Sequence, residues 1–409
     1  MAVSLFAADK LPAPQLLDLA RHKPHSAEFH DALVASLGQE KIQKGTAAIG
    51  EGPNFLWVVE SKTAPQLVID DGAPAKMKRL PKSDLWFALG TLETGSSHAY
   101  HYLVNGAKFG GDQNLAAFLP EAYSHPGVPQ GKLSDRLTMT SKIYDGMTTE
   151  YWIYVPAEYD ANTPAALMVW QDGQSQIDRD GPTHTLNTLD NLISEKKIPV
   201  IISVFIRPGS TGKKPQDMRS IEYDTVSDRY PRFLREELLP LVEAKYNIRK
   251  DAYSHGITGL SSGGICSFNA AWFMPDFFTR VWSRIGSFTS IQWKPGETLG
   301  GNDYPFMIRK QEKRNMRVWL SDGSEDLENR FGSWPLQNIQ MANSLKMEGY
   351  DFHFHFLNNT HNGAEGNSEM PTALTWLWRD YEPAKTEQQF TPDPAEKDKP
   401  YFRVKIYSR

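Results

Sequence analysis

The sequence predicts an α/β protein with a mostly parallel, doubly wound sheet, preceded by a small β-sandwich. From about residue 146 onward, short apolar runs alternate with amphipathic segments, as expected for parallel strands joined by helices. Between residues 46 and 120, short β-like runs follow one another with turn signals between them, which is typical of a sandwich. A Gly-x-Ser-x-Gly pattern over 259–263 lies between a predicted strand and a predicted helix.

Composition excludes several classes of protein. The chain has 409 residues, enough for two or three domains. Its 44 Lys and Arg against 49 Asp and Glu give a net charge of −5, which argues against a nucleic-acid or membrane-surface partner. No apolar run is long enough for a transmembrane helix. The single cysteine, Cys266, excludes an internal disulfide and a multi-cysteine metal site.

The N-terminal part begins with a segment that we interpret as a targeting remnant. Residues 1–8 are too short and uncharged for a complete export signal, so we expect the stub of a trimmed one and a secreted or periplasmic protein rather than a cytoplasmic one. We predict five regions: helical lead-in 1–45, β-sandwich 46–120, linker 121–145, catalytic domain 146–382 and C-terminal extension 383–409.

The β-rich region carries several large aromatic residues. Strands are expected at 55–59, 66–69, 84–89 and 98–104, and Asn105-Gly106 is a strong hairpin signal. Aromatic residues such as Trp57 and Trp86 could bind sugar, but we expect packing inside the sandwich or against the next domain. All candidate catalytic residues lie beyond residue 260, so we expect this region to shape or shield the substrate entrance.

The region after residue 146 supplies the parallel sheet. The expected strands are 150–156, 165–171, 199–206, 257–260, 280–285, 317–320 and 351–357. The expected helices are 185–197, 227–246, 334–348 and 371–381.

The Gly259-x-Ser261-x-Gly263 pattern has the composition of a nucleophile elbow. A serine on this sharp turn projects above the sheet edge, and its neighbours must be small where strand and helix cross. The N–H groups that open the following helix favour negative charge at the same place. Ser261 is therefore the candidate nucleophile, and the backbone N–H of Ser262 is a candidate oxyanion donor.

A serine nucleophile needs a base and an orienting acid. Three histidines follow Ser261. His353 and His355 alternate with phenylalanines along a strand, whereas His361 follows that strand in a loop, where a base is expected. The acid is expected in the loop after 318–320, and four residues there are candidates: Asp322, Glu325, Asp326 and Glu328.

These motifs together resemble the esterase-D family of α/β-hydrolases, which includes enterochelin and feruloyl esterases. The resemblance rests on the segments 169–173 and 259–264, on the loops at Gly323 and His361, and on the strand and turn at 100–106. It implies an α/β-hydrolase domain preceded by an immunoglobulin-like module, which also resembles carbohydrate-binding modules of the glycogen-binding type. Within the family, the Gly-x-x-acid turn over 323–326 points to Asp326 as the acid, with Asp322 and Glu325 as alternatives. The Asp-Gly turn at 172–173 points to the Gln174 N–H as second oxyanion donor.

The resemblance also suggests substrate-binding residues. Segment 219–223 is similar to an Arg-x-x-acid-aromatic segment of the family, so Arg219 is a candidate for holding a substrate carboxylate or phenolate. The alternative is an Arg219–Glu222 ion pair that fixes a loop. Trp293, Trp334 and Phe331 follow carboxyl ends of strands and are candidates for an acyl pocket or for core packing.

We therefore predict a serine carboxylic ester hydrolase that needs no metal or organic cofactor. Its expected partner is a small-molecule or sugar-linked ester, preferably an aromatic acyl ester of the feruloyl type. Siderophore trilactone hydrolysis of the enterochelin type is the alternative, although the acidic composition is unusual for binding a triply anionic ferric catecholate. A second alternative, from another class, is a catalytically inactive carbohydrate-binding protein.

Overall fold

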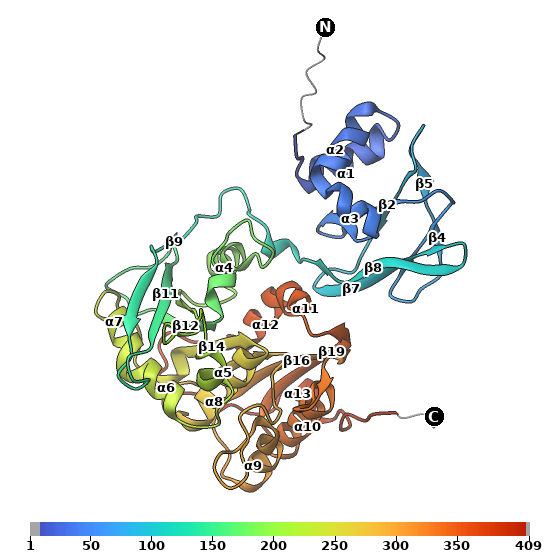
Figure 1. The fold of residues 1–409 in the computed structure, drawn as a ribbon. Helices are drawn as coiled ribbons and strands as arrows, with labels where there is room; N and C mark the ends of the chain where they lie inside the picture. The colour runs from blue at the N-terminus through green and yellow to red at the C-terminus, as the bar shows by residue number, and fades with distance from the viewer. Residues whose placement is uncertain (1–8, 406–409) are drawn as a thin grey trace. The chain divides into compact units, whose positions relative to one another are not determined.

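The computed structural model describes residues 9–405, so the expected targeting remnant, residues 1–8, lies outside the described residues. The chain divides into two compact units (Figure 1). The N-terminal unit comprises residues 1–120 with 367–369, and the C-terminal unit comprises 121–366 with 370–409. Within the described residues, no helix is long and apolar enough to cross a membrane.

The C-terminal unit is built on a nine-stranded sheet in the order β10-β11-β13-β12-β14-β15-β16-β19, with β9 paired to β11. The pairs from β13 to β19 are parallel, and β9, β10 and β11 add an antiparallel edge. The prediction of a mixed α/β fold with a largely parallel sheet is therefore confirmed. The strands are β9 (Lys132–Leu133), β10 (Leu137–Thr140), β11 (Thr148–Val155), β12 (Ala166–Gln171), β13 (Ile201–Ile206), β14 (His255–Leu260), β15 (Arg280–Arg284), β16 (Arg317–Glu325) and β19 (Asp351–Thr360).

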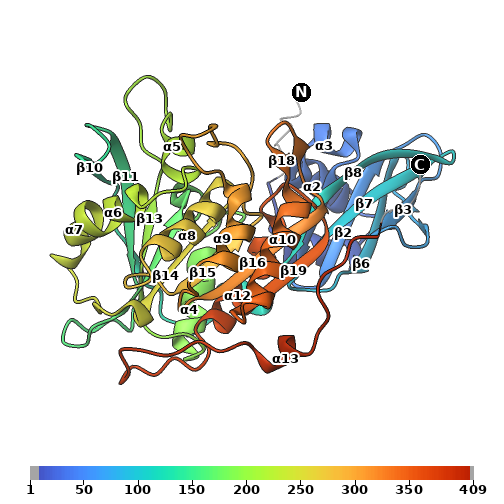
Figure 2. The ribbon, with the colours of Figure 1, turned by 90° about the horizontal axis from the view of Figure 1, so that it is seen from below.

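Helices cover both faces of this sheet (Figure 2). Every residue of β12 is buried, and its side chains alternate between two apolar cores, as expected for a strand covered on both sides. One core includes residues of α6 (Arg229–Phe233), α7 (Leu239–Glu243), α8 (Ser262–Phe273), α9 (Tyr304–Lys310) and α10 (Trp334–Met347). The other includes residues of α4 (Thr185–Ser194) and α12 (Met370–Leu377).

The helix expected over 227–246 is interrupted in its middle. Between α6 and α7 the chain forms a π-helical turn, η3 (Leu234–Leu238). Pro240 follows immediately, at the second position of α7. Proline has no N–H to donate to the carbonyl four residues earlier, and its ring clashes with that carbonyl in a regular helix. The wider turn relieves this conflict.

Shorter elements lie between residues 120 and 397. They are the helices α5 (Arg219–Tyr223), α11 (Ala364–Ser368) and α13 (Pro394–Lys397), the 3₁₀ turns η1 (Pro120–Ala122), η2 (Gly173–Ser175), η4 (Ala252–Ser254) and η5 (Gly301–Asp303), and a hairpin of β17 (Glu328–Asn329) and β18 (Gly332–Ser333).

The N-terminal unit contains two antiparallel four-stranded sheets, ordered β1-β2-β6-β5 and β4-β3-β7-β8. Their strands are β1 (Ala47–Glu51), β2 (Asn54–Glu60), β3 (Gln66–Ile69), β4 (Ala75–Lys76), β5 (Lys78–Arg79), β6 (Leu85–Thr91), β7 (Ser96–Val104) and β8 (Ala107–Ala117). Helices α1 (Ala13–His22), α2 (Ala27–Leu37) and α3 (Gln39–Lys44) share a core with β1, β2 and β6. The hairpin between β7 and β8 turns at Asn105 and Gly106, which both have positive φ as a tight type I′ turn requires.

The aromatic residues of the N-terminal unit lie mainly inside it. Trp57, Tyr100 and Tyr102 are buried in a core that both sheets contribute to. Trp86 is half-buried, and its indole N–H donates to the Ser61 carbonyl at 2.9 Å. These rings therefore pack within the unit and do not present an open stacking surface for a sugar.

Candidate active site

Ser261 lies on a strained turn between β14 and α8. Its φ of 60° and ψ of −118° lie in a region that non-glycine residues rarely adopt, and such strain is concentrated at functional sites. A Cβ at Gly259 would approach the Gly263 carbonyl oxygen to 2.4 Å, and one at Gly263 would lie 3.1 Å from the Cβ of Gln171. The small residues on both sides of Ser261 are therefore needed where strand and helix cross.

His361 connects Ser261 to Asp326. Its Nε2 lies 2.8 Å from Ser261 Oγ, and its Nδ1 lies 2.5 Å from Asp326 Oδ1. A carboxylate only accepts hydrogen bonds, so in the neutral ring Nδ1 carries the proton and Nε2 is free to accept the Ser261 hydroxyl proton. The His361 side chain is 21% exposed, whereas that of Asp326 is fully buried. The His361 ring is therefore partly accessible, whereas the carboxylate behind it is not.

Among the four candidate acids, Asp326 is the one hydrogen-bonded to His361. It also accepts the backbone N–H of Leu327 at 2.5 Å. Burial raises the pKa of Asp326, but hydrogen bonds from His361 and Asp322 outweigh burial and leave that pKa below its usual value. Asp326 is thus held as a carboxylate. Glu325 and Glu328 are exposed, and Asp322 is buried beside Asp326.

The two expected oxyanion donors lie in neighbouring turns. Ser262 is the first residue of α8, so its N–H has no acceptor within the helix. Gln174 lies in η2, directly after Asp172, which has a φ of 53°, and Gly173. A Cβ at Gly173 would lie 2.5 Å from the backbone of β13, and one at Gly263 would lie 3.3 Å from Asp172 Oδ2. The turn before Gln174 is therefore packed tightly against β13 and the elbow.

Arg219 does not pair with Glu222, so that alternative is wrong. Its Nε and Nη2 donate to the two carboxylate oxygens of Asp172 at 2.8 and 2.7 Å. Glu222 instead accepts the Gly209 N–H at 2.7 Å. The guanidinium of Arg219 also lies over the Tyr223 ring, 5.5 Å from its centre. In this structure Arg219 braces the turn that precedes Gln174.

Of the three aromatic candidates, Trp334 lies beside the reacting residues. Its ring is 5.7 Å from the His361 ring, nearly perpendicular to it, and it is buried. Trp293 is 47% exposed, and its backbone N–H donates to the carbonyl oxygen of Ser290. Phe331 is half-buried, and its carbonyl accepts from Ser290.

Sequence reasoning missed Ser287. Its hydroxyl lies 3.2 Å from Ser261 Oγ and 3.2 Å from the Trp334 indole nitrogen. The available signal was its place just after β15, the strand next to β14 in the sheet. Residues that follow adjacent parallel strands meet at one edge. Ser287 thus tethers Trp334 next to the elbow.

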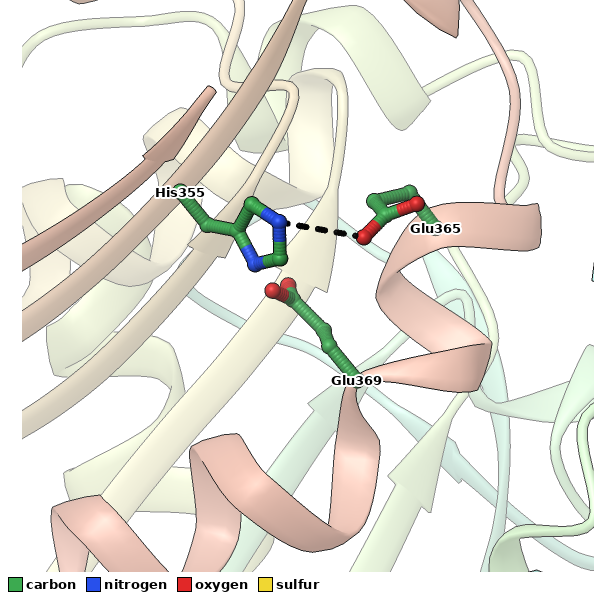
Figure 3. A group of neighbouring side chains, drawn as sticks. All are labelled: His355, Glu365 and Glu369. Atoms are coloured by element: carbon green, nitrogen blue, oxygen red, sulfur yellow. Dashed lines mark ion pairs between the residues drawn. The ribbon is translucent and has the colours of Figure 1, made fainter. Parts of the chain in front are cut away.

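The two other histidines after Ser261 lie on β19. The His353 ring packs against that of Trp319 in a tilted arrangement, with ring centres 4.0 Å apart. His355, Glu365 and Glu369 form a group whose ligand atoms all lie within 4.8 Å of one another (Figure 3). His355 Nε2 lies 3.4 Å from Glu365 Oε1. One imidazole and two carboxylates are a donor set that could hold a divalent transition metal, and the sequence analysis did not single it out.

A sizeable surface cavity lies away from this site. A cavity of about 530 Å³ is lined by residues from 130–137, 153–157 and 245–246, none of which is a predicted site residue. The hydrogen-bonded set around Ser261 is the better candidate, because it joins a strained hydroxyl, an imidazole and a carboxylate.

Comparison with known proteins shows the family to which the chain belongs. Residues 146–377, more than half of the chain, match the model of an esterase family described as "Putative esterase". The uncharacterized protein YbbA of Bacillus subtilis (strain 168) is 23% identical over 191 residues, 43% of this chain and 68% of that protein. An enterochelin esterase from Shigella flexneri has a similar fold, with a TM-score of 0.54, 16% identity, and coverage of 85% of this chain and 98% of that one. A ferulic acid esterase matches with a TM-score of 0.50, 17% identity, and coverage of 61% and 98%. The chain belongs to this esterase family and is a carboxylic ester hydrolase.

Proposed function

We propose that the chain hydrolyses esters through Ser261, His361 and Asp326, with a covalent acyl-enzyme intermediate. The observation that carries this proposal is the continuous hydrogen-bonded series from Ser261 Oγ to His361 Nε2, at 2.8 Å, and from His361 Nδ1 to Asp326, at 2.5 Å. It is the arrangement needed to remove a proton from the serine while stabilising the imidazolium that results.

The reaction then proceeds in two halves, acylation of Ser261 and hydrolysis of the acyl-enzyme. In the first, Ser261 Oγ attacks the ester carbonyl carbon while His361 Nε2 takes the hydroxyl proton. The backbone N–H groups of Ser262 and Gln174 hold the oxyanion. The tetrahedral intermediate collapses, the bond to the leaving alkoxide breaks, and His361 gives that oxygen the proton. In the second half, water attacks the acyl-enzyme through the same steps, and the acid leaves while Ser261 regains its proton.

The substrate that we favour is an aromatic acyl ester of the feruloyl type. Trp334 supports this choice, because its ring lies 5.7 Å from that of His361, where it can help to wall the acyl site. One of the similar structures is a ferulic acid esterase. Aromatic rings offer large contact areas to a flat acyl group. Arg219, with its charge already neutralised by Asp172, contributes orientation of the turn and not an anion site.

Siderophore trilactone hydrolysis is the second candidate. It is favoured by the match to an enterochelin esterase, which extends over 85% of this chain, against 61% for the ferulic acid esterase. The Arg219–Asp172 pair weighs against it, because it removes one cation from those available to an anionic catecholate. An inactive carbohydrate-binding protein is disfavoured by the intact hydrogen-bonded series and by the burial of Trp57.

We also propose that residues 146–382 form an α/β-hydrolase domain and that residues 46–120 form an immunoglobulin-like β-sandwich. The parallel strands β12 to β16 with the elbow after β14 support the first assignment. The two antiparallel sheets with a shared apolar core support the second.

A substrate panel tests the proposed function. The full-length chain is assayed with methyl ferulate, feruloylated arabinose, p-nitrophenyl acetate, and apo and ferric enterobactin, beside Ser261→Ala as a control. The proposal predicts the highest kcat/KM for the feruloyl esters and no turnover above background in the control. A higher kcat/KM for enterobactin would replace the preferred substrate with the second candidate. Equal rates for the variant and the parent would refute the mechanism.

A further inference from the structure

A second buried carboxyl group lies directly behind Asp326. Asp322, near the end of β16, is 2% exposed, and its Oδ1 accepts the Gly323 N–H at 2.8 Å. The Asp322 and Asp326 carboxyls lie close enough for each to shift the pKa of the other, upward for Asp322 and downward for Asp326. Within residues 9–405, no other group donates to Oδ2 of either side chain. A hydrogen bond between the two carboxyls would satisfy both buried oxygens.

This contact requires a proton. An ionised carboxylate only accepts hydrogen bonds, so two carboxylates cannot bond to each other unless one of them is protonated. Two like charges at this separation in a buried site also disfavour double ionisation. The proton belongs on the group that is stabilised least as an anion.

The surroundings assign the proton to Asp322. Asp326 accepts N–H groups from both His361 and Leu327, and both stabilise its charge. Burial raises the pKa of Asp322, and the hydrogen bond and charge of Asp326 raise it further.

On the neighbouring strand β15, the buried Arg284 lies opposite Ser321 and not opposite Asp322, and the groups that chiefly shift the pKa of Asp322 include no Lys or Arg. From the same segment the facing titratable group is Asp326, and from the loop after β19 it is His361, which contacts Asp326 on its other side. Across the strand pair, β19 places Phe356 opposite Asp322. From α10, the neutral amide of Asn338 lowers the pKa of Asp322, as does the Gly323 N–H, but burial and Asp326 outweigh both.

We propose that Asp322 is a positioning residue, a neutral carboxylic acid whose O–H donates to Asp326 Oδ2. This inference rests on the proposed function, because it gives the acid of the series its own orienting partner. The bond fixes the carboxylate plane, directs the other oxygen to His361, and draws charge away from it. Asp322 thereby limits how strongly Asp326 raises the basicity of the imidazole.

Substitution of Asp322 tests whether this side chain is a neutral hydrogen-bond donor or a second negative charge. Asp322→Asn keeps a neutral N–H donor, so kcat should stay within about threefold of the parent, and the acid limb of the kcat/KM profile should not move. Asp322→Ala removes the donor, so kcat should fall between about 10- and 100-fold through misorientation of Asp326, and the acid limb should move to higher pH. If Asp322 were ionised, Asp322→Asn would delete a charge near His361 and move the acid limb to lower pH. That result would overturn the proposal.

Infrared spectroscopy tests whether Asp322 is protonated, independently of enzyme activity. Glu222 is a second buried carboxyl whose raised pKa, about 8, leaves it protonated at neutral pH, so the spectra are taken in a Glu222→Gln background. A carboxylic-acid C=O band at pH 7 should be lost when Asp322→Asn is added and should persist when Ser261→Ala is added instead. Unchanged spectra on addition of Asp322→Asn would refute the proposal. If the protein shows the band but hydrolyses no ester, only the proposed function is refuted. Urea unfolding serves as a control that each variant is folded.

Discussion

Replacement of Arg219 by methionine tests whether Arg219 holds the oxyanion turn or binds substrate. The substitution preserves much of the apolar stem and removes both hydrogen bonds to Asp172, at 2.8 and 2.7 Å. A hydrogen bond to a charged group contributes about 1.5 to 3 kcal/mol. The side chains of Arg219 and Asp172 are 30% and 19% exposed, so solvent screens part of this contribution. We expect the free energy of unfolding to fall by about 2 to 3 kcal/mol.

The effect on catalysis should appear in kcat. Asp172 lies two residues before Gln174 and is held in a left-handed conformation, so its release would let the proposed oxyanion donor move. Loss of one such donor reduces kcat by about 10²- to 10³-fold, and we expect a loss that approaches this range. Arg219→Lys, which keeps the charge without the two-pronged geometry, should be intermediate.

The assay compares a neutral and a carboxylate-bearing p-nitrophenyl ester, with stability measured by urea unfolding. Arg232→Met is the matched control, because Arg232 makes an exposed ion pair with Glu236 and should change neither kcat nor stability appreciably. A positioning role predicts a similar loss of kcat for both esters. A rise in KM for the anionic ester alone, with kcat and stability unchanged, would refute the reasoning and restore Arg219 as a substrate-binding residue.

Three further predictions concern the reacting residues and a buried carboxyl. Ser261→Ala should lower kcat about 10⁴-fold or more, whereas Ser262→Ala should be mild because its backbone N–H survives; the reverse order would show that the nucleophile is misassigned. Asp326→Asn should lower kcat about 10⁴-fold by changing the His361 tautomer, whereas Glu325→Gln should leave steady-state rates almost unchanged; equal losses would contradict the choice of acid. Burial raises the pKa of Glu222 from 4.5 to about 8, so the folded protein holds a proton that the unfolded chain releases, and stability should decline by up to roughly 5 kcal/mol between these pH values. Urea unfolding at pH 5, 7 and 9 should show that Glu222→Gln removes this decline, and parallel curves for variant and parent would contradict the assignment.

The elbow could be predicted because its geometry is encoded locally. Gly259 and Gly263 leave the space that Ser261 requires, and their spacing is visible in the sequence. The parallel sheet could be predicted for a similar reason, because continuous apolar runs such as 201–206 indicate strands that are covered on both faces. His361 was separated from His353 and His355 by its place after a strand.

Other features depend on packing between distant segments. The partner of Arg219 is 47 residues away, on a turn whose left-handed residue no composition rule marks. The loop expected after residues 318–320 contained four candidate acids, and only the family resemblance pointed to Asp326. Burial of Asp322 follows from its direction on β16, which extends to Glu325, beyond the 317–320 strand expected from the sequence. Ser287 reaches Ser261 only because β15 lies next to β14 in the sheet.

The central claim is that Ser261 forms the acyl-enzyme. Its most direct test is to quench the chain rapidly with methyl ferulate in the Asp326→Asn background, where turnover is slowed, and to locate the acyl group by peptide mass spectrometry. The account predicts one added feruloyl group on Ser261 and none when Ser261→Ala is combined with that background. A feruloyl group on Ser262 or Ser287, or continued hydrolysis by Ser261→Ala without any adduct, would contradict it.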